Sequence, residues 1–245
     1  MGTNILNTYQ LRARLYPALL TVAPILGVAI GYYGVSLDLK GSLLSLFVGL
    51  GGLYLVANIV REYGKSLEVR LYKEWGGTPT TQLQRHRDKA VNAHTKAGRH
   101  RFLAGKIGIP YPDASSELVD PEAADDVYAA GTGWLIEHTR ERPQFQLLFE
   151  ENVAYGYRRN TRALKPLGII ICLAAITWVL YSASVINQLG FNREAAAVLS
   201  PGTLGSLLFS LLILLVWVFY FTKRTVRTSA FTYADRLLRA CELLS

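Results

Sequence analysis

Four long apolar blocks dominate the pattern of hydrophobic and polar positions along the chain. Each block is close to the roughly 20 residues that a helix needs to cross the hydrocarbon core of a bilayer. Short polar links join the first block to the second and the third to the fourth, so each pair is expected to form an antiparallel hairpin. The pattern therefore predicts an all-α integral membrane protein with four transmembrane helices in two hairpins, at residues 15–35, 41–60, 167–186 and 199–222.

The long segment between the hairpins, residues 61–163, has the spacing of soluble helices. Leu67, Leu71 and Trp75 recur every four residues, which predicts that the second span continues as a helix beyond the membrane. A Gly-Gly pair follows and is typical of a helix end. We therefore expect a helical domain inserted between spans 2 and 3.

Start signals further along the insert predict its remaining helices. The stretch from Thr81 to Gln84 has the spacing of a capping box and predicts a helix over about 82–103. Glycines and prolines interrupt residues 105–126, where six acidic residues occur between positions 113 and 126. This composition predicts a loop with an acidic face.

The second half of the insert has two clearer starts. Asp120 followed by Pro121 is typical of an N-cap with proline in the first turn, and it predicts a helix ending at about His138 or Thr139. Pro143 then opens a last helix, which is expected to run into the third span. Each hairpin would thus be extended by a helical stalk.

The distribution of positive charge predicts the orientation. Of the 26 Lys and Arg residues, only Lys40 and Arg193 lie in the two short links. Basic residues near span ends are retained in the cytoplasm, so both termini and the inserted domain are expected there. The predicted parts of this multi-pass inner-membrane protein are an N-terminus (1–14), a first hairpin (15–60), a helical cytoplasmic domain (61–163), a second hairpin (164–222) and a basic C-terminal tail (223–245).

Composition agrees with this class of protein. Hydrophobic residues make up 51% of the chain and charged residues only 18%, against about 25% charged in soluble domains. The apolar content excludes a disordered chain, and two cysteines exclude a secreted disulfide scaffold. A signal peptide is the competing interpretation of the first block, but the block is longer than a typical signal-peptide core.

The most distinctive local string follows the predicted helix end at Trp75. Free N–H groups at a helix start attract anions, threonine hydroxyls add donors, and arginines recognise phosphate. We therefore consider an anion site for a phosphate-bearing signal, with Gly76 and Gly77 as a hinge. The alternative is that Thr81 only caps a helix and that the arginines meet the acidic segment. The candidate ligand-binding residues are Thr80, Thr81, Arg85 and Arg87.

The two halves of the insert differ in charge. Residues 61–106 are rich in Lys and Arg, whereas residues 113–126 contain six acids and no base. The two halves are expected to pair, either within one chain or between subunits of a homo-oligomer. Specific nucleic-acid binding is not needed, because basic residues also gather near anionic lipids.

Two further residue sets adjoin or line the spans. Glycines permit close helix contact, within the bundle or between subunits, whereas the fourth span is bulky and apolar and is expected to face lipid. The predicted packing residues are Gly27, Gly31, Gly49 and Gly52. The predicted contacts to anionic lipid headgroups are Arg158, Arg159, Arg162, Lys165, Lys223 and Arg224.

The sequence shows no constellation typical of catalysis. The four histidines lack recognised metal-ligand spacing, and neither Cys172 nor Cys241 has an adjacent partner for nucleophilic chemistry. We therefore expect no metal, no cofactor and no enzymatic activity. The spans contain essentially no ionisable residues, which disfavours coupled transport.

The layout is similar, in organisation only, to small bacterial four-span membrane effectors. In those proteins a cytoplasmic domain senses a signal and the spans assemble and permeabilise the membrane. The resemblance implies an oligomeric channel or effector whose cytoplasmic domain responds to a signal or partner. The alternative is a non-conducting scaffold or sensor that recruits a cytoplasmic protein through residues 61–163.

Overall fold

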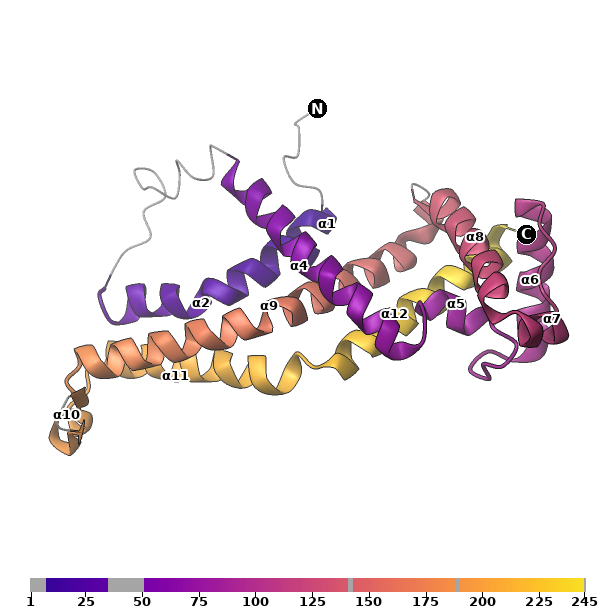
Figure 1. Ribbon diagram of the computed structural model, residues 1–245. Coiled ribbons are helices and arrows are strands. Elements are labelled where there is room, and N and C mark those ends of the chain that lie inside the picture. The colour runs from indigo at the N-terminus through magenta and orange to yellow at the C-terminus, as the bar shows by residue number, and fades with distance from the viewer. Residues whose placement is uncertain (1–7, 35–50, 141–142, 188–189, 245) are drawn as a thin grey trace, which may run out of the picture. The chain divides into compact units, whose positions relative to one another are not determined.

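The computed structural model describes residues 8–34, 51–140, 143–187 and 190–244 (Figure 1). Helices dominate these residues, and the exception is a short antiparallel pair of strands, β1 (Ile186–Asn187) and β2 (Gly190–Phe191). The prediction of an α-helical chain is confirmed.

Three helices among the described residues are long and apolar enough to cross a membrane. The first, Thr8–Gly31, contains α1 (Thr8–Gln10), a π-helical turn (Leu11–Leu15) and α2 (Tyr16–Gly31). The second, Pro143–Ser182, is a 3-10 turn (Pro143–Phe145) continued by α9 (Gln146–Ser182). The third, Pro201–Tyr220, is α11 (Pro201–Leu215) with a π-helical end (Val216–Tyr220). These helices indicate a membrane protein.

The remaining predicted span, residues 41–60, lies partly outside the described residues. Its last part belongs to α4 (Gly52–Trp75), which is unbroken to Trp75. The predicted continuation of this helix to the Gly-Gly pair is therefore confirmed.

Contacts within the chain define two compact units. The first comprises the described residues within 1–67 and 156–225, and the second comprises those within 68–155 and 226–245. Both α4 and α9 contain residues of each unit, as does α12 (Lys223–Leu238). The C-terminal segment predicted as a basic tail is thus helical, ending in α13 (Ala240–Leu244).

In the first unit, α2 packs against α11 through small residues. A Cβ atom on Gly31 would lie 3.0 Å from the carbonyl oxygen of Gly202, and one on Gly27 would lie 2.6 Å from the ring of Phe209. The Ser206 hydroxyl donates to the carbonyl oxygens of Gly27 (3.2 Å) and Gly202 (2.9 Å). Such close approach is what glycine permits in a membrane helix.

The α11 helix is not apolar all round, contrary to prediction. Thr203, Ser206 and Ser210 are buried on one face, whereas Leu208 and Leu212 are exposed on the other. Small hydroxyl side chains tolerate close packing, and some of them hydrogen-bond to nearby carbonyls. The exposed face of this helix consists mainly of leucines.

The second unit is a small helical domain. Besides the ends of α4 and α9 it contains α5 (Pro79–Gln84), α6 (Ala93–Ile107), α7 (Ala114–Val119) and α8 (Pro121–Thr139). The α10 helix (Arg193–Ala197) lies in the first unit. The core of the second unit includes Leu83, Leu103, Leu135, Phe145, Leu148, Leu237, Leu238 and Cys241.

Two predicted elements of this domain are wrong. The helix predicted over 82–103 is two helices, because α5 ends at Gln84 and α6 starts only at Ala93. The predicted loop over 105–126 contains α7, whose N-cap Asp113 accepts a hydrogen bond from the amide of Ser116 at 2.7 Å. In contrast, Asp120 caps α8, which ends at Thr139 as predicted.

Candidate functional site

The two glycines after α4 close the helix by a Schellman motif. The amide of Gly77 donates to the carbonyl oxygen of Tyr72 (2.8 Å), and the amide of Gly76 donates to that of Lys73 (3.3 Å). The φ angle is +82° at Gly76 and +129° at Gly77, in a region that L side chains rarely adopt. The predicted hinge residues therefore form an ordered helix end.

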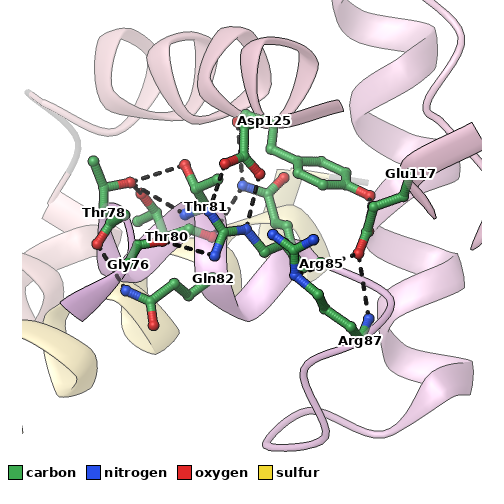
Figure 2. A network of polar contacts seen from close by, with 12 residues as sticks. Gly76, Thr78, Thr80, Thr81, Gln82, Arg85, Arg87, Glu117 and Asp125 are labelled. Atoms are coloured by element: carbon green, nitrogen blue, oxygen red, sulfur yellow. Dashed lines mark hydrogen bonds and ion pairs between the residues drawn. The ribbon is translucent and has the colours of Figure 1, made fainter. Parts of the chain in front are cut away.

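A threonine cluster starts the next helix (Figure 2). Thr78, and not Thr81 as predicted, is the N-cap of α5, because its Oγ1 accepts from the amide of Thr81 at 3.3 Å. Pro79 occupies the first turn, where proline is favoured, and this sets the start of the helix. The hydroxyls of Thr80 and Thr81 lie 3.2 and 2.8 Å from that of Thr78, so both are directed towards the cap.

Arg85 links the end of α4 to α8. Its Nε donates to Oδ1 of Asp125 at 2.8 Å, and its Nη2 forms an ion pair with Oδ2 of the same carboxylate. Its Nη1 donates to the carbonyl oxygen of Gly76 at 2.9 Å. The hydrogen bonds to Asp125 raise the pKa of Arg85. All three guanidinium nitrogens therefore have partners within the second unit (Figure 2).

The carboxylate of Glu117 in α7 lies against backbone amides that follow α5. It accepts from the amide of His86 (2.7 Å), the hydroxyl of Tyr128 (2.7 Å) and the amide of Arg87 (3.4 Å). The Nε of Arg87 lies 3.9 Å away as an ion-pair partner. Burial acts to raise the pKa of Glu117, but the hydrogen bonds from His86 and Tyr128 outweigh it and lower the pKa.

Two buried side chains of α6 bind the carbonyl groups at the end of α5. The Nζ of Lys96 donates to the carbonyl oxygens of Arg85 (2.5 Å) and Asp88 (2.7 Å). The Nε2 of His100 lies 2.9 Å from the carbonyl oxygen of Gln84, which assigns the ring proton to Nε2. These bonds replace the helical hydrogen bonds that a continuous helix over 82–103 would have made.

Burial and the nearby ring of His86 lower the pKa of His100 to about 4. His100 is 6% exposed, and its ring centroid lies 5.1 Å from that of His86. The imidazole is therefore neutral at pH 7 and donates one hydrogen bond. His100 is thus a buried histidine that binds the carbonyl group at the end of α5.

Gln84 connects this network to α8. Its Nε2 donates to the carbonyl oxygen of Tyr128 (3.2 Å) and to the Thr132 hydroxyl (3.0 Å), while its Oε1 accepts from the Tyr111 hydroxyl at 3.0 Å. Sequence reasoning missed Gln84, and it also missed Lys96, Glu117 and Asp125 as individual partners. The only signal available was the opposite charge of the two halves of the insert, and this does not identify which individual residues are partners.

The residues predicted to contact lipid headgroups have different environments. Arg159 is 4% exposed, and its guanidinium donates to Oδ1 of Asn160. Lys165 donates to the carbonyl oxygens of Val218 at 2.8 Å and Phe221 at 3.3 Å, in and directly after the π-helical segment that follows α11. Arg158 and Arg162 are half-buried, while Lys223 and Arg224 are exposed at the start of α12.

The predicted packing glycines also divide. Gly27 and Gly31 lie against α11 within the first unit. Gly52 is buried in the first turn of α4, and Gly49 lies outside the described residues.

The two arginines of the predicted anion site each have an acidic partner. Arg85 pairs with Asp125, and Arg87 pairs with Glu117.

Three basic side chains around α5 have partners in the second unit: Arg85 pairs with Asp125, Arg87 pairs with Glu117, and Lys96 donates to backbone carbonyl groups. Within residues 8–34, 51–140, 143–187 and 190–244, no group of three or more His, Cys, Asp or Glu side chains is placed to hold a metal ion. Of the four residues predicted for an anion site, Arg85 and Arg87 face Asp125 and Glu117, whereas the hydroxyls of Thr80 and Thr81 face Thr78. An external anion would have to displace Asp125 or Glu117.

No protein-family model matches the chain, and no curated protein or solved structure matches it either. The class that the fold and this site define is a helical membrane protein with a polar helical domain.

Proposed function

We propose that this chain is an oligomeric membrane effector or channel of the bacterial inner membrane. In this proposal four spans cross the membrane, and both termini and the 61–163 domain are cytoplasmic. The domain responds to a signal or partner, and the spans then change membrane permeability. No catalytic step is part of the proposal.

The observation that carries the proposal is the contact made by Arg85. The Arg85 side chain holds the carbonyl group of Gly76, directly after α4, and at the same time the carboxylate of Asp125 in α8. A phosphate-bearing signal that competes with Asp125 for Arg85 would release the end of α4. Because α4 also contains residues of the first unit, its backbone offers a route by which that change reaches the spans.

Support on the membrane side comes from the packing of α2 on α11. The carbonyl oxygen of Gly31 would lie 2.1 Å from a Cβ on Gly202, so these two helices meet through backbone atoms. Backbone contact this close is sensitive to small changes in helix position. In this proposal it is the contact that rearranges when the membrane is permeabilised.

The test is the membrane potential of bacteria that express the chain from a tight inducible promoter. The wild type is expected to depolarise the cells, and a Gly27→Leu, Gly31→Leu variant is expected to fail, because both side chains collide with α11. A Gly205→Leu variant is the matched control, since a Cβ there meets nothing within 4 Å. A wild type that leaves the potential intact on overproduction contradicts the effector proposal.

The second candidate is the non-conducting scaffold, and one observation favours it. Leu118 and Val119 of α7 are 82% and 86% exposed, so an adjacent apolar pair is available for contact with another protein. A scaffold would leave the potential intact and co-purify with a cytoplasmic protein through the 61–163 domain.

A further inference from the structure

The outer end of α7 presents an exposed apolar pair. Leu118 and Val119 are adjacent, and each exposes more than four-fifths of its surface. Their neighbour Glu117 points inward and accepts hydrogen bonds from His86 and Tyr128, so the short helix is held in place. We call Leu118 and Val119 the α7 tip.

Two acidic side chains follow the α7 tip closely in the sequence. Glu122 and Asp126 are exposed in the first turns of α8, and their spacing of four residues places them on one face. Neither makes an ion pair with any residue that the structure describes. The chain carries a net charge of +8, so these two carboxylates form a negatively charged site on a protein that is positively charged as a whole.

One face of α6 has the opposite character. Ala93, Ala97 and Gly98 are exposed together with His94, and a Cβ at Gly98 would meet nothing within 4 Å, so small side chains make up much of this face. Arg101 on the same face and Lys89 in the preceding loop are exposed, and neither is ion-paired within the described part of the chain. We call these six residues the α6 face.

We propose that the α7 tip of one copy docks on the α6 face of a second copy. The apolar pair would cover the alanines and the glycine, while Glu122 and Asp126 would approach Lys89 and Arg101. The acidic side chains that follow the tip disfavour an anionic lipid surface or a nucleic acid and favour a basic partner. A second copy supplies both the basic groups and exposed small side chains that the apolar pair can cover.

The two surfaces are different, so the contact is head-to-tail. A head-to-tail contact forms a ring when its rotation closes. This inference deepens the proposed function and rests on it, because it names the surfaces through which copies of an oligomeric effector associate.

The experiment uses charge reversal in the full-length protein. Two differently tagged copies are co-expressed and solubilised, and the fraction of one that co-purifies with the other is measured. The acid-reversed variant (Glu122→Lys, Asp126→Lys) and the base-reversed variant (Lys89→Glu, Arg101→Glu) are each expected to co-purify with themselves at least fivefold less than the wild type does. A Leu118→Ser, Val119→Ser variant is expected to show the same loss.

The two reversed variants are then combined. In a mixture, the new lysines of one variant meet the new glutamates of the other, and the remaining contact has the wild-type charges. Co-purification of the mixture is expected to return to within twofold of the wild type, which a folding defect could not produce. Reversals that leave self-association unchanged, or a mixture that fails to recover, would overturn the proposal.

Measuring membrane potential in the same cells separates the two proposals. Self-association through these surfaces without depolarisation contradicts the effector function and supports the interface. Depolarisation that persists, together with undiminished association, in both reversed variants contradicts the interface and supports the effector function.

Discussion

At the scale of single residues, the second unit depends on buried and half-buried charged groups that have matched partners. Asp125 receives two contacts from Arg85, and Glu117 receives hydrogen bonds from the backbone and from Tyr128. A carboxylate that accepts several hydrogen bonds is stabilised in its charged form. Removing one member leaves the other without its partner in a partly buried position.

An Asp125→Ala substitution is expected to lower the free energy of unfolding of the second unit by about 2 kcal/mol, because Arg85 loses a bidentate charged partner. Urea-dependent proteolysis of the purified protein in detergent measures the change. Asp126→Ala is the matched control, since Asp126 is exposed, and its effect is expected to stay within about 0.5 kcal/mol. Equal effects of the two substitutions would show that the ion pair does not stabilise the fold.

His100 predicts a specific pH dependence of stability. Its pKa in the folded protein is lowered to about 4, below the ordinary value of about 6.5. Between pH 6.5 and 4 the unfolded chain binds a proton that the folded chain does not, so stability falls as the pH is lowered through this window.

The midpoint of urea-dependent proteolysis is expected to fall with decreasing pH across that window in the wild type. His100→Gln keeps a donor for the carbonyl group of Gln84 and is expected to flatten the slope. His94→Gln, at an exposed position of the same helix, should retain the slope. Identical slopes in the wild type and the His100 variant would rule out this residue as the cause.

At the scale of elements, helix ends determine the shape of the region after α4. The helix stops at Trp75 because Gly76 and Gly77 adopt positive φ angles, and α5 restarts within three residues of them at Pro79. The next helix then ends at Gln84, where Lys96 and His100 take over its last carbonyl groups. Each boundary has a partner that satisfies its backbone groups.

Loss of the cap should weaken α5 by a predictable amount. Thr78→Ala is expected to cost about 1 kcal/mol of stability, because the amide of Thr81 loses its acceptor. Thr78→Ser keeps the hydroxyl and should cost much less. Hydrogen exchange of the amides of α5 reads out the difference, and similar protection in the two variants would contradict this role for Thr78.

At the scale of the whole molecule, the C-terminal helices complete the second unit. Leu237 and Leu238 of α12 are each 1% exposed and join a core that contains Leu103 and Leu135. The guanidinium of Arg99 in α6 lies 2.9 Å from Glu242 of α13. The second unit is therefore built from the insert and the C-terminus together.

A Leu237→Ala substitution is expected to destabilise the second unit by about 2–5 kcal/mol, because it leaves a cavity in this core. Leu243→Ala is the matched control, since Leu243 is 63% exposed and its loss should have little effect. Limited proteolysis of the full-length protein measures both. Equal resistance in the two variants would show that the C-terminal segment is not part of the domain core.

The sequence by itself determined the elements whose causes are local. Apolar blocks about 20 residues long indicate membrane helices whatever they contact. The start of α8 follows from Asp120 and Pro121, and the end of α4 follows from the two glycines after it. These signals act within one turn of the chain. They predicted the helical class and the membrane-spanning character.

Tertiary structure alone decided which charges meet and which helices break. The break before α6 depends on Lys96, His100 and Glu117, which lie 8, 16 and 31 residues from their partners Asp88, Gln84 and His86 in the sequence. The same holds for the pairing of Arg85 with Asp125, for the hydroxyl face of α11 and for the C-terminal helices in the core. Such contacts depend on distance in space, which the order of residues alone does not specify.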